Sequence, residues 1–185
     1  MSASEAPSQF PGGGANVHFR SRLEYSTPSN LLPVKGIAMA TTVTVKVYFE
    51  AAHRLHNPAQ TDEWNREVYG KCNNPHGHGH NYVLEVSVEG EPNSDTGYLI
   101  DMKDLKEIIS QTVVADCDHR HLNIEVPWLS GINPTSENLA RVFFDRIDAD
   151  LPDEIRLAAV TVHETERNSA TYRRSFDYES QLQVH

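Results

Sequence analysis

Three histidines at alternating positions, His76, His78 and His80, occupy the segment from Cys72 to Tyr82. Side chains two residues apart on an extended strand project to the same side, so neighbouring imidazoles of this run can share one metal ion. The glycines between them let the backbone approach a ligand closely. Since neutral imidazole is a preferred zinc ligand, the run predicts a metal site. The alternative is a histidine-rich surface loop.

A fourth histidine, His53, ends a segment in which apolar residues occupy every second position from Val43 to Phe49. His53 shares the parity of those apolar residues, and the histidine run shares the parity of Tyr82 and Leu84. If both segments are strands, His53 and the run extend from the apolar faces of those strands, where a dry metal pocket can form. A bulge would break this parity. Spacing alone does not say which two of His76, His78 and His80 join His53.

Cys72 follows Lys71 and lies close in sequence to the proposed metal site. A metal cation and a neighbouring lysine both lower a thiol pKa, and the thiolate is the reactive form. Cys72 is therefore either a fourth ligand, which would close the site, or a base or nucleophile beside an open three-histidine site. An inert buried cysteine is the third interpretation.

Two further segments carry groups that could act with this site. Asp118 precedes His119, and a carboxylate beside an imidazole can orient or charge it, as relay systems require. Solvated histidines at a helix end are an equally plausible interpretation, and we interpret the preceding Cys117 as core packing. Glu164 ends a predicted strand, where its carboxylate could bind the amidine-like edge of a pterin or guanine, or lie in solvent.

Strands and helices that could position these residues are predicted in pairs along the chain. Strands are predicted from Thr41 through Phe49 and from Tyr82 to about Glu89, and two more at 155–164 and 170–176. Helical periodicity runs from Asp101 to about residue 115, and again after Pro134-Thr135. The order ββααββ is an α+β arrangement, with helices on one face of a mainly antiparallel sheet. Residues 56–75 are predicted to form a long polar loop.

Composition restricts the class of protein. A net charge of −10 argues against general nucleic-acid binding, and no apolar run approaches the roughly 20 residues needed to span a bilayer. Two cysteines and ten histidines indicate a reducing compartment, so we expect a cytoplasmic protein. Residues 1–40 are rich in glycine and turn formers, which predicts a disordered extension before a single domain at 41–185.

The chain resembles the 6-pyruvoyl-tetrahydropterin synthase family and its close relatives, the 6-carboxytetrahydropterin synthases. The similarity extends from about residue 42 to about residue 174. The motifs that carry it occur in the family's order: Phe49–Leu55, Gly70–Tyr82, Asp95–Gly97, Asp118-His119, Pro134–Asn138 and His163–Thr165.

This resemblance implies the tunnelling fold, a four-stranded antiparallel sheet with two helices on one face. It further implies a barrel-forming trimer, a homohexamer made of two trimers, and active sites at subunit interfaces. The implied substrate is 7,8-dihydroneopterin triphosphate. The implied roles are as follows: His53, His78 and His80 bind Zn²⁺, Cys72 is the catalytic base, Asp118 and His119 are its relay partners from across a subunit boundary, Glu164 anchors the pterin, and Thr135 and Glu137 help to bind it.

Three functions are compatible with these features. The five residues between Cys72 and His78 favour a lyase that forms 6-pyruvoyl-tetrahydropterin and releases triphosphate. The runs Phe49–His53 and Asn133–Glu137 instead resemble the carboxy-forming branch of the queuosine pathway, which releases acetaldehyde as well. A non-catalytic zinc- or pterin-binding module is the remaining alternative, and it would require a closed site that includes Cys72.

Overall fold

The computed structural model describes residues 40–174, so the predicted N-terminal extension lies almost entirely outside the described residues. Two long strands, β1 (Thr41–His53) and β2 (His78–Gly90), pair antiparallel along their whole length. β4 (Arg156–His163) pairs antiparallel with β2, and β5 (Ser169–Arg173) pairs antiparallel with β4. These four strands match the predicted antiparallel sheet.

A fifth strand corrects the predicted strand count. β3 (Arg120–His121) pairs parallel with Ala51 and Ala52 of β1, which gives the sheet order β3-β1-β2-β4-β5 within residues 40–174. Two residues are too few to show an alternating pattern, so the sequence carried no signal for this strand. Its effect is to hold the segment that follows residue 117 against the C-terminal end of β1, which carries Ala51 and Ala52.

Both predicted helices are present and begin at the predicted caps. α2 (Met102–Ile109) begins after Asp101, whose Oδ1 accepts a hydrogen bond from the Lys103 backbone N at 2.8 Å, and α5 (Ser136–Asp150) begins after Thr135. α2 continues through a π-helical turn, η2 (Ser110–Val114), into the short α3 (Ala115–Cys117). Short turns α4 (Leu122–Glu125) and η3 (Pro127–Leu129) follow β3.

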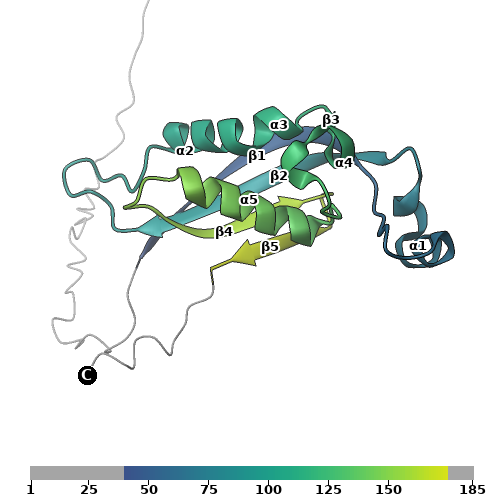
Figure 1. Ribbon diagram of the computed structural model, residues 1–185. Coiled ribbons are helices and arrows are strands. Elements are labelled where there is room, and N and C mark those ends of the chain that lie inside the picture. The colour runs from purple at the N-terminus through teal and green to yellow at the C-terminus, as the bar shows by residue number, and fades with distance from the viewer. Residues whose placement is uncertain (1–39, 175–185) are drawn as a thin grey trace, which may run out of the picture. The chain divides into compact units, whose positions relative to one another are not determined.

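The predicted loop at 56–75 was wrong, because it contains α1 (Asp62–Tyr69) and the 3-10 turn η1 (Gly70–Asn73). α1 is polar, so it shows little apolar periodicity. Local hydrogen bonds stabilise it instead: Thr61 caps its start, and the buried Asn65 amide bonds the backbone of Asn57 and Thr61. Figure 1 shows α1 beyond the strand ends.

The core lies between one face of the sheet and the helices α2, α3 and α5 (Figure 1). Phe49 and Tyr82 stack with ring centroids 5.0 Å apart, and Phe143 of α5 contacts Phe49 edge-on. These rings form the apolar floor on which the histidine-bearing ends of β1 and β2 rest. None of the helices within residues 40–174 is long and apolar enough to cross a bilayer.

Candidate metal centre

Four side chains converge where β1 ends, β2 begins and β4 ends. His53, His78, His80 and Glu164 each offer one ligand atom, and these four atoms lie within 4.8 Å of one another. His53 Nε2 lies 3.1 Å from His78 Nε2 and 3.2 Å from Glu164 Oε1. His80 Nε2 lies 3.4 Å from the same carboxylate oxygen. We call this group the histidine cluster.

Strand register explains the convergence. His53 pairs with His78 across the two strands, and Ala51 pairs with His80, so all three histidines project from the helix-covered face as their parity predicted. His76 is excluded from the cluster: it lies exposed in the turn before β2, and its backbone N donates to Asn74 Oδ1 at 3.1 Å. Gly77, at φ +74°, changes the direction of the chain between that turn and the strand. Geometry therefore separates His76 from His78 and His80, which spacing could not.

The hydrogen bonds around the cluster leave its ring nitrogens available to a cation. His53 Nδ1 is 2.9 Å from the carbonyl of Pro134, which fixes the proton on Nδ1 and leaves the lone pair on Nε2. His78 Nδ1 and His80 Nε2 are buried and make no hydrogen bond. Buried polar atoms are normally paired, so the unpaired His80 Nε2, which lies 3.4 Å from Glu164 Oε1 in the cluster, fits a metal ion held there. Three imidazoles and a carboxylate form a donor set that could hold such an ion.

Burial sets the protonation of these histidines. His53 is fully buried, and burial lowers its pKa to about 4, helped by the nearby His78, His80 and His121. Burial also lowers the pKa of His80, against the opposing effect of Glu164. At neutral pH both rings are therefore uncharged, which is the form that binds metal.

Gly77 and His121 contact each other beside the cluster. A Cβ on Gly77 would lie 2.6 Å from His121 Nε2 and 2.9 Å from the His53 carbonyl oxygen. The His121 ring therefore packs against the turn that leads into His78. His121 was not predicted as a site residue, and its position follows from the parallel pairing of β3.

Cys72 is not one of the four clustered groups; the fourth is Glu164. Cys72 lies half-buried in η1, and its backbone carbonyl accepts a hydrogen bond from Leu55 N at 2.9 Å. That bond holds the Cys72 segment beside the chain that leaves His53. Within residues 40–174, the thiol itself has no hydrogen-bond or ion-pair partner. Cys117, by contrast, is fully buried, and burial raises its pKa to about 12, as expected for an inert core thiol.

Asp118 and His119 form a second group at the β3 edge. Asp118 Oδ2 lies 2.9 Å from His119 Nδ1, while Asp118 Oδ1 accepts the Glu50 backbone N–H at 2.9 Å. His119 adopts φ +58°, and its N–H donates to the Glu50 carbonyl. The hydrogen bond that His119 donates to Asp118 raises the pKa of His119, and the one that Asp118 accepts from the Glu50 backbone N–H lowers the pKa of Asp118. The prediction did not assign a role to Glu50, although this residue lies within the Phe49–Leu55 motif.

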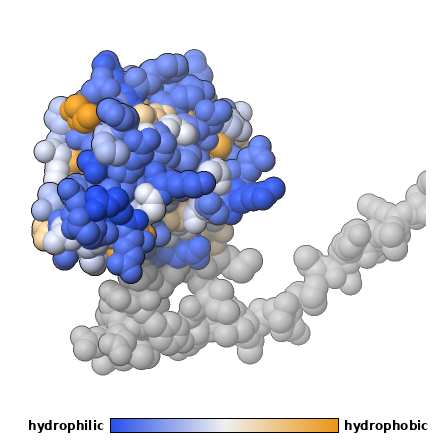
Figure 2. Space-filling view, turned by 90° about the vertical axis from the view of Figure 1, so that its right-hand side faces the viewer, coloured by the Kyte–Doolittle hydropathy of each residue, from blue (hydrophilic) through white to orange (hydrophobic). Residues whose placement is uncertain are grey.

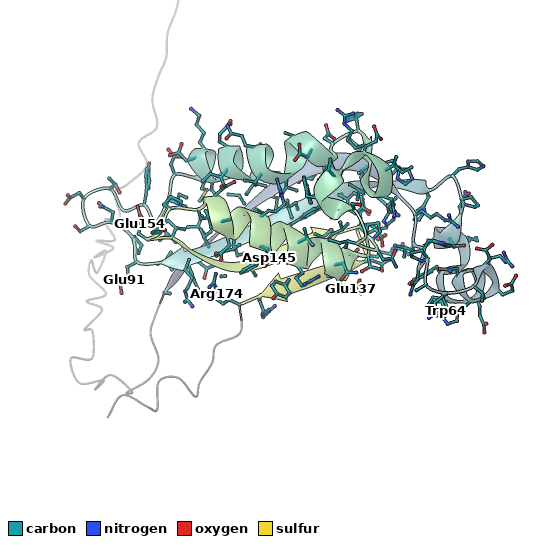
Figure 3. The ribbon with its side chains drawn as sticks, in the orientation of Figure 1. Trp64, Glu91, Glu137, Asp145, Glu154 and Arg174 are labelled. Carbon is teal, nitrogen blue, oxygen red and sulfur yellow. The ribbon has the colours of Figure 1, made fainter. Side chains whose placement is uncertain are left out.

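Thr135, Glu137 and Glu164 lie close together. The family resemblance, and not their spacing, had placed these three residues at one pterin site. They line a recess of about 360 Å³ with Leu55 and Asn168. Thr135 Oγ1 accepts from Asn138 N, so this hydroxyl serves first as the α5 cap. Figure 3 labels Glu137 at the start of α5, at the end of the sheet where α1 lies.

Comparison with known proteins places this arrangement in context. Residues 42–175 match the family model described as 6-pyruvoyl tetrahydropterin synthase. A Poecilia reticulata 6-pyruvoyl tetrahydrobiopterin synthase is 44% identical over 129 residues, covering 68% of this chain and 84% of the relative. The Homo sapiens protein of that name is 37% identical over 131 residues, covering 71% and 90%. The solved Caenorhabditis elegans 6-pyruvoyl tetrahydropterin synthase superposes with a TM-score of 0.69 at 37% identity, covering 74% of this chain and 97% of that one.

Proposed function

The chain belongs to the 6-pyruvoyl tetrahydropterin synthase family. From that premise we propose that it is a zinc-dependent carbon–oxygen lyase that converts 7,8-dihydroneopterin triphosphate to 6-pyruvoyl-tetrahydropterin, with elimination of triphosphate. The observation that carries the proposal is the histidine cluster, whose four ligand atoms lie within 4.8 Å of one another at the end of the sheet.

His53, His78 and His80 would hold the zinc ion through ring nitrogens. Two of them, His53 and His80, are kept neutral by burial, and the Pro134 carbonyl fixes the tautomer of His53. When bound, zinc would supply Lewis-acid polarisation of the oxygens on the substrate side chain, which acidifies the neighbouring C–H and O–H bonds. Three protein ligands leave a coordination position for substrate, as catalytic zinc sites require.

Glu164 has two possible partners, because Oε1 faces the cluster while the residue also lines the recess with Thr135 and Glu137. We assign it to the pterin. A carboxylate can accept paired N–H bonds from the amidine-like edge of the ring, and three imidazoles already suffice for a catalytic zinc. The recess then holds the ring, and the substrate side chain extends toward the histidines.

Cys72 would act as the base that moves protons along the substrate side chain. Its thiolate would take a proton from a side-chain carbon and return it elsewhere, while the C–O bond to triphosphate breaks and that anion leaves. The ring gains the hydrogens that the side chain loses, so the overall change needs no external reductant.

Asp118 and His119 would relay protons to Cys72 from a neighbouring copy of the chain. Two observations support this assignment. Asp118 and His119 pair with each other at 2.9 Å, and the His119 side chain is 76% exposed, so a neighbouring subunit can reach it. In residues 40–174 neither makes a hydrogen bond or ion pair with the Cys72 thiol. A site completed between subunits agrees with a homohexamer built from two trimers.

The test is incubation of zinc-loaded protein with 7,8-dihydroneopterin triphosphate and identification of the products by mass. We expect 6-pyruvoyl-tetrahydropterin and triphosphate, with His78→Ala losing both zinc and turnover. A carboxy product with acetaldehyde would assign the chain to the carboxy-forming branch. Absence of turnover in the zinc-loaded protein would favour a binding module instead.

A further inference from the structure

A recess of about 590 Å³, whose lining includes Arg54, the residue that follows His53, contains an excess of positive charge. It is walled by α1, η1, residues 73–75 and Arg54, and its cations are Arg54, Arg66 and Lys71. One carboxylate, Asp62, lies in the same wall. The chain as a whole carries a net charge of −10, so three cations around one hollow are a local reversal. Figure 2 faces the end of the molecule that carries α1, and hydrophilic residues dominate it.

We propose that this recess, which we call the cationic recess, binds a polyphosphate, and that its natural occupant is the triphosphate of the substrate. The identity of that occupant rests on the proposed function. The chemistry that recognises it does not: guanidinium and ammonium groups bind phosphate oxygens by charge-assisted hydrogen bonds.

Arg54 is held in place before any ligand arrives. Its Nε donates to the Asn73 carbonyl at 3.1 Å, and its Nη2 contacts Asn73 Oδ1 at 3.4 Å. Asn73 is itself 6% exposed and donates to the Leu55 carbonyl at 2.7 Å. A guanidinium has five N–H donors, and these contacts use two. The remaining donors are therefore presented on a fixed support, which reduces the entropy lost when an anion binds.

Lys71 and Arg66 differ in how free they are. The Lys71 ammonium makes no hydrogen bond or ion pair with any residue between 40 and 174, and its side chain is exposed. Arg66 pairs with Glu63 at 2.7 Å, an exposed contact three residues away on α1. Exposed pairs of this kind contribute little, so a phosphate can compete for Arg66. Asp62 opposes an anion, but three cations outnumber it.

The cationic recess adjoins the proposed chemistry through the backbone. Arg54 directly follows His53, and Lys71 directly precedes Cys72. The hydrogen bond from Leu55 N to the Cys72 carbonyl, at 2.9 Å, holds these two segments side by side. A leaving group attached to the substrate side chain could therefore reach the recess from a reacting carbon near Cys72. As the C–O bond breaks, the departing triphosphate takes the electron pair, and the cations stabilise that charge.

Calorimetric titration with inorganic tripolyphosphate tests the proposal without requiring turnover. The proteins are zinc-loaded wild type, Lys71→Gln, Arg66→Gln and the control Lys103→Gln, together with the zinc-deficient His78→Ala. All are titrated at one ionic strength, with zinc content and sedimentation checked for each. Lys103 is an exposed cation on α2, outside the recess. We expect each recess variant to bind about tenfold more weakly, since a charged hydrogen bond contributes on that scale, and Lys103→Gln to match wild type.

The outcomes separate this proposal from the proposed function. Weakened tripolyphosphate binding in the recess variants supports the recess even if the protein never turns over dihydroneopterin triphosphate. If turnover is present, the same variants should raise KM and also lower kcat, because the cations bind the triphosphate in the substrate and stabilise the charge it gains as it leaves. Binding that is unchanged in both variants, or absent in wild type, would overturn the proposal. So would binding that disappears in His78→Ala but persists in Lys71→Gln, because the phosphate would then be bound to the metal.

Discussion

Replacing Gly77 with alanine should weaken metal binding as well as destabilise the fold. Gly77 lies at φ +74°, which costs a residue with a Cβ roughly 1–2 kcal/mol. The new Cβ would also lie 2.6 Å from His121 Nε2 and 2.9 Å from the His53 carbonyl oxygen, and neither distance can be kept. Relief of such overpacking typically costs a further 1–3 kcal/mol. The turn before His78 must move, and His78 moves with it.

Two other glycines are matched controls. Gly97 has a similar φ of +73°, but nothing lies within 4 Å of its Cβ position, so Gly97→Ala isolates the conformational cost. Gly79 lies between the two clustered histidines of β2, yet its Cβ would meet only the Ala51 carbonyl at 3.6 Å, an ordinary contact. Gly79→Ala therefore tests whether any added methyl group near the site has the same effect.

The assay combines denaturant unfolding of the metal-free proteins with competitive zinc titration at one protein concentration. We expect Gly97→Ala to lose about 1–2 kcal/mol of unfolding free energy with unchanged zinc affinity. Gly77→Ala should lose about 1–3 kcal/mol more and bind zinc at least about tenfold more weakly. Adding His121→Ala to Gly77→Ala should restore part of both. Equal stability and equal zinc affinity in Gly77→Ala and Gly97→Ala would refute the steric argument.

Three further predictions follow from the site. Glu164→Gln should keep one zinc per chain and raise KM for the substrate about tenfold, because one charged hydrogen bond to the pterin is lost. Loss of the zinc would show instead that Glu164 is a metal ligand. The metal-free protein should lose stability as pH falls from about 6.5 through about 4, because His53 takes up its proton with a pKa of 6.5 in the unfolded chain and about 4 in the folded one. At pH 4.5 the wild type should have lost about 2.5 kcal/mol of unfolding free energy relative to His53→Gln, as measured by matched unfolding curves. A pH-independent difference between those two proteins would contradict it. Mixing inactive Cys72→Ala and His119→Ala proteins under conditions that exchange subunits should restore part of the turnover, and no restoration at any ratio would argue against a shared site.

Strand periodicity was sufficient to predict much of the site. The parity of Val43 to His53, and of His80 with Tyr82, follows from the two-residue repeat of a strand and needs no knowledge of topology. Once both segments are strands of one sheet, their histidines fall on the face that the apolar residues define. The caps Asp101 and Thr135 likewise predicted where the two main helices begin, because side-chain capping is a local interaction.

The rest depended on contacts between distant segments. Glu164 joins the cluster because β4 lies beside β2, a pairing that no local pattern specifies. His76 lies outside the cluster because Gly77 adopts a positive φ, a conformation that glycine permits but that its presence in the sequence does not predict. The polar helix α1 is stabilised by hydrogen bonds from Asn65 and Thr61 rather than by an apolar face, so periodicity missed it. β3 and its contact between His121 and Gly77 likewise arise from tertiary pairing.

The central claim is that the histidines alone hold the metal and leave Cys72 free for chemistry. The most direct measurement is zinc content and turnover of Cys72→Ala, purified beside wild type. We expect one zinc per chain, as in wild type, with turnover of 7,8-dihydroneopterin triphosphate abolished. Loss of the zinc would show that the thiol is a structural ligand, and normal turnover would show that it is not the base; either result would contradict the account.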